Sequence, residues 1–278
     1  MKYNYSRYKR VFAFGCSFTS YHWPTWADII ASECVNARFY NFGRSGMGNL
    51  AMSVRVAEAH NKFKFDKDDL IIVLWSSYSR EDRWLTYDGE QYTEKWICFG
   101  NVWNSAFYGK DFTKKFADPL GYLIRDLGLI YSTHSLLDNL PCDSIKLFSY
   151  TIKKDLDESV PIERDKCYHK IYETYKDFIE GNIKNVMFDT IWEQNRLDKL
   201  NIGYTYFGFW NKIDYDPHPN TLSYYKWLQT CDLDLSNISK EYAEQSYQKL
   251  LTCKSFQDMV EVFSQQQKNQ DESYILLV

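Results

Sequence analysis

Residues 69–75 read Asp-Leu-Ile-Ile-Val-Leu-Trp, and this stretch decides the fold. Its apolar run is unbroken, whereas a strand with one wet face alternates apolar and polar residues. A continuous run predicts a strand that is buried on both faces, as in a parallel sheet covered by helices. We therefore expect the flanking segments to supply further strands and the helices that cover them.

The neighbouring segments fit that expectation. Short apolar runs at 11–14, 37–42 and 145–149 predict three more strands, and 202–208 is either a loop or a short aromatic strand. Helical spacing of apolar residues predicts helices over 25–33 (opened by Pro24), 49–62 and 119–140. Strands that alternate with helices predict a three-layer α/β/α sandwich with a mostly parallel central sheet, of the flavodoxin-like type.

The chain divides into a main α/β domain over 1–228 and a helical C-terminal extension with a polar tail over 229–278. Two insertions interrupt the main domain. Residues 87–116 are rich in aromatic side chains and show no clean period, which indicates a functional or disordered loop. Residues 153–199 are charged and predicted to be helical.

Composition excludes several classes of protein. The net charge is −4 with acids and bases interspersed, so no nucleic-acid partner is expected. No apolar run approaches the roughly 20 residues that cross a bilayer, and the first residues lack the apolar core of a signal peptide. We expect a soluble protein, cytoplasmic or virion-associated. Seven scattered cysteines predict neither a disulfide framework nor a zinc site.

A candidate nucleophile follows the first predicted strand, in Gly-Cys-Ser-Phe-Thr at 15–19. Ligands of open α/β sheets bind beyond the carboxyl ends of the strands, which is where Ser17 lies. A serine at a strand end is ordinarily a turn or helix-capping residue, and it becomes a nucleophile only beside a base. The side chain of Cys16 is expected to point to the other side of the turn.

The best base is His218, in Asp-Tyr-Asp-Pro-His-Pro-Asn at 214–220, which reads as a proline-braced turn. Asp216 or Asp214 is the candidate third member that orients the imidazole. His22 is a rival base, but it is too near Ser17 in sequence to reach it easily. The same two carboxylates and imidazole suit a divalent metal, yet no further ligand cluster supports one, so no metal or cofactor is expected.

Acyl transfer also needs hydrogen-bond donors for the developing oxyanion. The candidates are the backbone N–H groups of Ser17 and Gly46, the latter in the glycine-rich turn at 41–49, together with Ser77 after the strand at 69–75. Gly46 equally suits a turn that needs positive φ. Ser77 equally suits a structural strand end.

These pieces, in this order, resemble the SGNH/GDSL hydrolases over roughly residues 10–228. Gly15-Cys16-Ser17 corresponds to the family's Gly-Asp-Ser block. Residues 41–46 correspond to its Asn-x-x-x-x-Gly turn, and Asp216 with His218 corresponds to its last block. The resemblance implies a serine esterase without a cofactor, in which Ser17 forms an acyl-enzyme, His218 is the base, and Ser17, Gly46 and Ser77 form the oxyanion hole.

The chain departs from the family at two positions. Ser77 stands where the family has an Asn, and Tyr215 stands three residues before the histidine, where the family has its Asp. The triad acid therefore stays open between Asp216 and Asp214. Arg80, in a charged run at 80–83 that is expected to be solvated, is close enough to contact a substrate.

The predicted substrate is a small-molecule or carbohydrate ester, with a carbohydrate O-acetyl group favoured because Trp96 and Trp103 suit stacking on sugar rings. Two alternatives remain. One is a catalytically weak binding or structural protein on the same fold, for example in a virion. The other is an acyltransferase that uses the same residues. The sequence leaves the oligomeric state open.

Overall fold

The computed structural model describes residues 3–87, 92–103, 108–151, 162–184, 186–187, 204–206, 215–253 and 256–264. Its central sheet has the strand order β2-β1-β3-β6, and every neighbouring pair is parallel. These strands are β1 (Arg10–Phe14), β2 (Arg38–Asn41), β3 (Asp69–Trp75) and β6 (Asp143–Phe148). The four expected strands and their parallel arrangement are confirmed.

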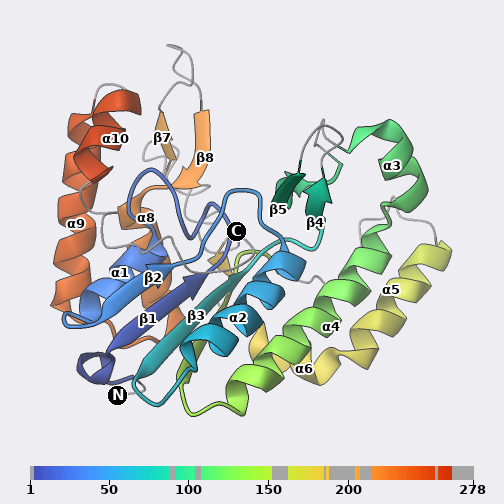
Figure 1. Ribbon diagram of the computed structural model, residues 1–278, viewed down its shortest axis with the longest axis horizontal. Coiled ribbons are helices and arrows are strands. Elements are labelled where there is room, and N and C mark those ends of the chain that lie inside the picture. The colour runs from blue at the N-terminus through green and yellow to red at the C-terminus, as the bar shows by residue number, and fades with distance from the viewer. Residues whose placement is uncertain are drawn as a thin grey trace.

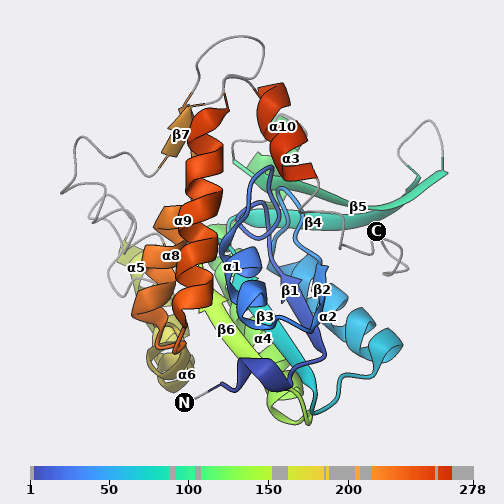
Figure 2. The same ribbon diagram turned by 90° about the vertical axis from the view of Figure 1, so that its left-hand side faces the viewer.

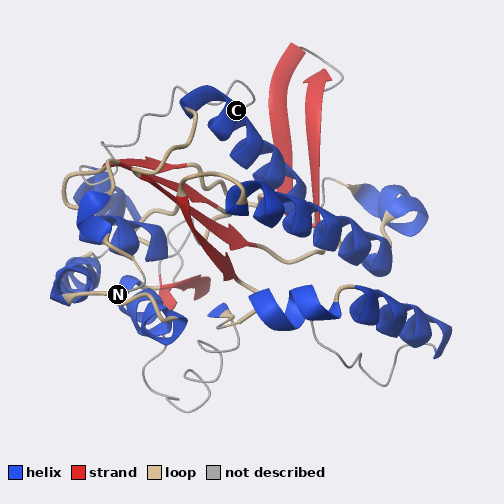
Figure 3. Ribbon diagram, turned by 90° about the horizontal axis from the view of Figure 1, so that it is seen from below, coloured by secondary structure: helices blue, strands red, loops and turns tan. Residues whose placement is uncertain are grey.

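Helices cover both faces of this sheet (Figures 1 and 3). On one face lie α1 (Trp26–Glu33), α8 (Thr221–Leu228) and α9 (Asn237–Thr252). On the other lie α2 (Asn49–Phe63) and α4 (Pro119–Asp138), with α5 (Ile162–Thr174) and α6 (Lys176–Asn182) beside them. The predicted three-layer sandwich is confirmed, and so is the helical character of the second insertion where it is described.

The central strand β3 is buried along its whole length, as its apolar run predicts. Arg10 pairs with Asp69 across the start of β1 and β3, and the guanidinium donates Nε to Oδ1 at 2.6 Å and Nη2 to Oδ2 at 2.7 Å. A two-point contact of this kind fixes a planar guanidinium against a carboxylate. The register that it favours places Phe14, the last residue of β1, opposite Val73, so β3 continues for two residues beyond the end of β1.

The strand order contains a topological switch point. From β1 the chain passes through α1 to β2 on one side, and then through α2 to β3 on the other side of β1. The connection that leaves β1 leads to α1 on one face of the sheet, and the connection that leaves β3 leads to α4 on the other face. In open α/β sheets this divergence places the ligand-binding crevice outside the carboxyl ends of the two strands. Ser17 follows β1 and Ser76 follows β3, so both belong to that crevice.

The segment from 80 to 116 differs from its prediction. It forms an antiparallel hairpin, β4 (Arg80–Tyr87) with β5 (Tyr92–Asn101), followed by α3 (Gly109–Phe116). Figure 2 shows the hairpin reaching out from the body of the protein. Its register shifts twice, between Arg80 and Asp82 and between Leu85 and Tyr87. Such irregularities interrupt the two-residue alternation by which a strand is recognised in sequence.

The later part of the chain adds a ribbon of β7 (Tyr204–Tyr206) and β8 (Tyr215–Pro219), and a last helix, α10 (Phe256–Ser264). Two 3₁₀ turns lie at η1 (Tyr5–Arg7) and η3 (Gln229–Cys231). The Glu33 carboxylate, at the end of α1, accepts bonds from Ser236 N at 2.7 Å and Ser239 N at 3.3 Å. The start of α9 is thereby tied to α1, while a domain boundary at 228 stays a prediction.

Candidate active site

Ser17 lies in a tight turn that follows β1 directly. Thr19 N donates to Cys16 O at 2.9 Å and Ser20 N donates to the same oxygen at 3.2 Å, which folds the chain back at this point. A Cβ on Gly15 would lie 1.9 Å from Thr19 Oγ1, so the fold-back requires glycine. Ser17 is 7% exposed, and Cys16 is fully buried in the core; that the Cys16 side chain points away from Ser17 stays a prediction.

The glycine-rich turn after β2 packs onto this turn. Arg44 N donates to Gly15 O at 3.1 Å, and the Asn41 side chain donates to Thr19 O at 2.8 Å. A Cβ on Gly43 would lie 2.8 Å from Ser20 N, so the two backbones are in close contact. The first two sequence blocks, which are separated by a helix in the chain, therefore form one surface.

Gly46 has a φ of +75°, as a turn glycine can, and a second reason for glycine at this position comes from β5. Its carbonyl accepts a bond from Gly100 N at 3.0 Å, and a Cβ would lie 2.3 Å from Cys98 O. The hairpin thus holds this turn in its left-handed conformation. The role of the Gly46 N–H as an oxyanion donor stays a prediction.

The end of β3 is fixed by Asn49, at the start of α2. Ser76 N donates to Asn49 Oδ1 at 2.8 Å, and Asn49 Nδ2 donates to Ser76 O at 3.0 Å. The Ser77 hydroxyl shares a 2.8 Å hydrogen bond with the Ser79 hydroxyl. The structure therefore engages Ser77 in its own turn, and its donation to an oxyanion stays a prediction.

His218 lies in β8 rather than in the expected proline-braced turn. The segment pairs with β7, which explains the difference. Tyr204 lies opposite Pro219 and Tyr206 lies opposite Tyr215, so residues 215–219 form one strand of a short antiparallel ribbon. The prolines tolerate this because a ribbon edge does not require their missing N–H. The side chain of Asp216 and the whole of Asp214 lie outside the described residues, so the triad acid stays open.

The first and last blocks are in contact. The His218 ring stacks on the Tyr21 ring with centroids 3.8 Å apart and 17° between planes, and lies 5.0 Å from the Phe18 ring. Trp23 Nε1 donates to Pro219 O at 2.9 Å. We call Phe18, Tyr21 and Trp23 the aromatic cradle. It brings the segment that directly follows Ser17 into contact with the imidazole of His218, although Ser17 and His218 are 201 residues apart in sequence (218 − 17).

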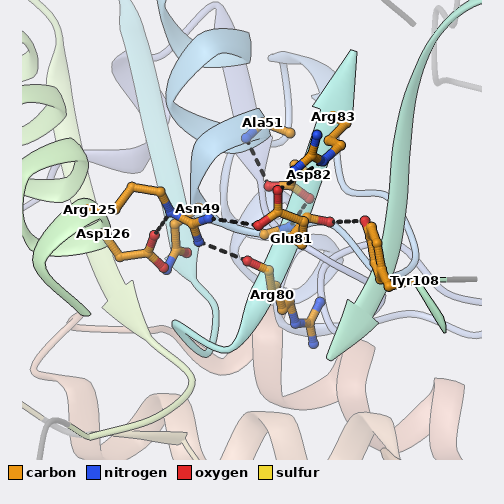
Figure 4. A network of polar contacts seen from close by, with 10 residues as sticks. Asn49, Ala51, Arg80, Glu81, Asp82, Arg83, Tyr108, Arg125 and Asp126 are labelled. Atoms are coloured by element: carbon orange, nitrogen blue, oxygen red, sulfur yellow. Dashed lines mark hydrogen bonds and ion pairs between the residues drawn. The ribbon is translucent and has the colours of Figure 1, made fainter. Parts of the chain in front are cut away.

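A network of polar side chains, which the sequence analysis missed, lies beside the same strand ends (Figure 4). Asn49 Nδ2 donates to Asp126 Oδ2 at 2.7 Å, and Arg125 Nε donates to Asp126 Oδ1 at 2.7 Å. Arg125 also donates Nη2 to Arg80 O at 2.8 Å and Nη1 to Glu81 Oε2 at 3.4 Å. This polar network fastens α2, β3 and β4 to α4.

Asp82 fastens the hairpin to α2. Its two carboxylate oxygens accept bonds from Gly48 N at 2.8 Å and Ala51 N at 3.0 Å, at the start of the helix, where backbone N–H groups lack partners within the helix. Burial raises the pKa of Asp82, and these N–H donors oppose that shift. The solvated run predicted for 80–83 is therefore wrong for Glu81, which is 8% exposed, and for Asp82, which is 1% exposed, whereas Arg83 is exposed as predicted.

The position of Asp126 in the sequence already indicates a buried carboxylate. It lies on the apolar stripe of α4, three residues after Leu123 and four before Ile130, where a carboxylate needs partners. Burial raises its pKa to about 6, against the opposing charge of Arg125. A carboxylate at an inward position of a predicted helix is therefore the signal by which the network could have been found in the sequence.

A small pocket opens between the ends of β3 and β6. Ser76, Ser77 and Asp126 supply polar atoms to its wall, and Phe148 and Tyr150 supply apolar surface. The Ser76 hydroxyl is buried and has no hydrogen-bond partner among the described residues.

The predicted substrate-binding residues are dispersed. Arg80 donates Nη1 to Met47 O at 2.8 Å, beside Gly46. Trp96 is 5% exposed and packs edge-on against Trp84, so little of its ring is open to a sugar. Trp103 is 43% exposed. Substrate contact by these three residues stays a prediction, and packing already explains Trp96.

Within the described part of the chain, no three His, Cys, Asp or Glu side chains gather as metal ligands do. The arrangement of two carboxylates with His218 falls partly outside those residues. In the same part of the chain, none of the helices combines the length and the apolar character that a bilayer crossing requires.

Two solved structures are similar to this chain. A member of the lipolytic protein G-D-S-L family from Veillonella parvula is 18% identical, with a TM-score of 0.36, and the match covers 80% of this chain and 97% of that one. An alpha/beta hydrolase enzyme from the metagenome of Lake Arreo, Spain, is 11% identical, with a TM-score of 0.43, and the match covers 85% and 97%. No protein-family model and no curated protein sequence matches. Since one fold hosts many functions, the function has to be argued from the site.

Proposed function

We propose that the protein is a serine esterase in which Ser17 is the nucleophile and His218 is the base. One observation carries the proposal: the turn that holds Ser17 contacts both the glycine-rich turn, through Arg44 N and Gly15 O, and the imidazole of His218, through Phe18 and Tyr21. A hydroxyl, a base and backbone donors at a switch point are the elements of acyl transfer.

The reaction follows from these roles. Ser17 Oγ attacks the ester carbonyl while His218 takes its proton, and the N–H groups of Ser17 and Gly46 hold the oxyanion. The tetrahedral intermediate collapses to an acyl-enzyme, and the imidazolium returns the proton to the leaving alcohol. Water, deprotonated by His218, then releases the acid. Asp216 or Asp214 orients the imidazole.

A short acyl group on a carbohydrate is the favoured substrate. The exposed ring of Trp103 supports it, because a free aromatic face can stack on a sugar. The burial of Trp96 reduces that support to a single tryptophan.

The test is hydrolysis of p-nitrophenyl acetate by the wild type and by Ser17→Ala and His218→Ala. We expect each variant to lose at least about a thousandfold in kcat/KM, because the residues act as a unit. The matched controls are Ser20→Ala, in the same turn, and His22→Ala, beside the same tyrosine; both keep activity. Turnover that survives Ser17→Ala would exclude this nucleophile.

A fluorophosphonate probe extends the test to an enzyme that rejects the acetate. We expect mass spectrometry to find the label on Ser17 in the wild type and in Ser20→Ala, and none on that peptide in Ser17→Ala. Labelling at another serine would contradict the assignment.

One observation favours a second function, a binding protein that has lost efficient catalysis. The Ser77 hydroxyl, which stands where the resembling family has its Asn, is bonded to Ser79, so the third oxyanion donor is weak. A wild type that neither turns over the acetate nor reacts with the probe would favour this function. Product analysis with an added sugar acceptor separates hydrolysis from acyl transfer.

A further inference from the structure

The ring of His218 is held through its face. Tyr21 covers it at 3.8 Å with nearly parallel planes, and Phe18 approaches at 5.0 Å with a 47° tilt. Stacking of this kind fixes the orientation of an imidazole by its π surface, and so does not itself engage the ring nitrogens, which a base needs for proton transfer.

Tyr21 suits the charged intermediate as well as the neutral base. During acyl transfer the imidazole becomes an imidazolium, and an aromatic face beside a cation stabilises it. This contact is stronger in the transition state than in the resting enzyme, which is the condition for a contribution to kcat.

Tyr21 is itself held by Trp23. The two rings meet edge to face, with centroids 4.6 Å apart and 81° between planes. Trp23 is 1% exposed, and its Nε1 donates at 2.9 Å to the carbonyl of Pro219, the residue after His218. The tryptophan therefore fixes both the tyrosine that covers His218 and the backbone that carries His218.

The C-terminal helices α9 and α10 pack against Trp23 and Tyr21. Trp23 is buried in one cluster with Leu250 of α9 and with Met259 and Phe263 of α10, and Tyr21 packs against that cluster. Figure 1 shows α9 running along one side of the sheet, with α10 at its upper end. The C-terminal extension therefore packs against the aromatic residues that contact His218 and its neighbour Pro219.

We propose that Tyr21 is a positioning residue for His218, and that α10 keeps Tyr21 in place through Trp23. The catalytic consequence rests on the proposed esterase function, whereas the positioning itself has a readout that needs no activity. Because Tyr21 is proposed to act through the base that it stacks on, its removal should lower kcat and leave KM nearly unchanged.

The first experiment is NMR of protein labelled at histidine, with the His218 signals assigned by their loss in His218→Ala. A ring stacked at 3.8 Å shifts the imidazole C–H signals upfield. We expect Tyr21→Leu to move them back toward ordinary values and Tyr21→Phe to retain them, because phenylalanine keeps the aromatic face. Unchanged signals in Tyr21→Leu would overturn the proposal.

Kinetics of the same variants test the consequence. We expect Tyr21→Leu to lose about 10- to 100-fold in kcat, a fraction of the full effect of a general base, and Tyr21→Phe to stay within about threefold. Signals that shift without any loss of kcat in an active enzyme would overturn the positioning role and leave the esterase standing. An inactive wild type whose signals still shift would reject the esterase and keep the stacked contact.

The role of α10 is tested with Phe263→Ala against Phe116→Ala, which removes an exposed phenylalanine from α3. We expect the first to shift the His218 signals in the direction of Tyr21→Leu, and the second to leave them unchanged. If Phe263→Ala does not fold, Phe263→Leu keeps most of the volume and gives a smaller shift of the same sign. A folded Phe263 variant with wild-type signals would refute the link from α10.

Discussion

Two buried regions flank the carboxyl ends of β1 and β3, and they are built differently. The aromatic cradle of Phe18, Tyr21 and Trp23 holds His218 by ring contacts. The polar network around Asn49 and Asp126 instead directs its hydrogen bonds toward its own members and nearby backbone (Figure 4). The cradle contacts the base of the proposed reaction, whereas the hydrogen bonds of the network join helices and strands to one another, so we propose that the cradle serves the reaction and the network the scaffold.

A second histidine makes the same contrast. His134 of α4 is 3% exposed and accepts a 2.9 Å bond from Trp75 Nε1. Burial lowers its pKa to about 4, which keeps it neutral over the physiological range. His134 is therefore a packing residue of the core. Both histidines lie among aromatic rings; His134 also accepts a hydrogen bond through Nε2, whereas His218 stacks face to face on Tyr21.

The largest expected effect comes from breaking the network. Asp126→Ala removes the carboxylate that accepts bonds from Asn49 Nδ2 and Arg125 Nε, and we expect a loss of about 3–4 kcal/mol in the free energy of unfolding. Asp126→Asn, which keeps the shape and one acceptor, should lose less. Urea unfolding measures both. The esterase kcat/KM per folded molecule should stay near wild type, and a large loss would move Asp126 from the scaffold into the site.

Gly46 is the residue of the glycine-rich turn that contacts the hairpin, so substituting it tests how far the two segments depend on each other. Gly46→Ala combines positive φ with a Cβ at 2.3 Å from Cys98 O, and we expect about 2–3 kcal/mol of destabilisation and a lower kcat. The control is Gly109→Ala, where φ is +58° and nothing lies within 4 Å of the added Cβ. We expect it to lower the free energy of unfolding by about 1 kcal/mol and to keep full activity. Equal losses in the two variants would show that the contact with β5 has no effect on stability.

The smallest effect is the pH response of His134. Its pKa falls from 6.5 to about 4 on folding, so between these values the unfolded chain binds the proton more tightly and stability falls as pH falls. Between pH 7 and pH 5 we expect this to remove up to about 2 kcal/mol. His134→Gln should lack that loss in urea unfolding at the two pH values.

Asp126 acts in the opposite sense. Its pKa rises from 3.8 to about 6 on folding, so its contribution is present below pH 3.8 and lost as pH rises through about 6. Because wild type and His134→Gln share Asp126, the difference between their pH responses isolates the histidine. An identical pH response in the two proteins would contradict the buried neutral state of His134.

The layout of the sheet could be read from the sequence because it depends on local pattern. The run at 69–75 is apolar at every position after Asp69 and becomes a strand buried on both faces, and the glycines at 15 and 46 lie in the tight turns that their residue type suits. The order of the blocks along the chain named Ser17 and His218 as candidates, since α/β topology gathers strand ends at one edge.

Other features depended on which surfaces meet. The hairpin at 80–101 was missed because its register shifts break the alternation, and the burial of Glu81 and Asp82 depends on α2 and α4, which are distant in sequence. The stacking of Tyr21 on His218 and the backing by α10 likewise join segments whose local patterns say nothing of each other. The sequence by itself determined the strands of the central sheet, the helices α1, α2 and α4 that cover it, and the candidate nucleophile and base. Only the tertiary structure decided which charged groups are buried and which rings hold His218, because burial and ring contact are properties of pairs of surfaces.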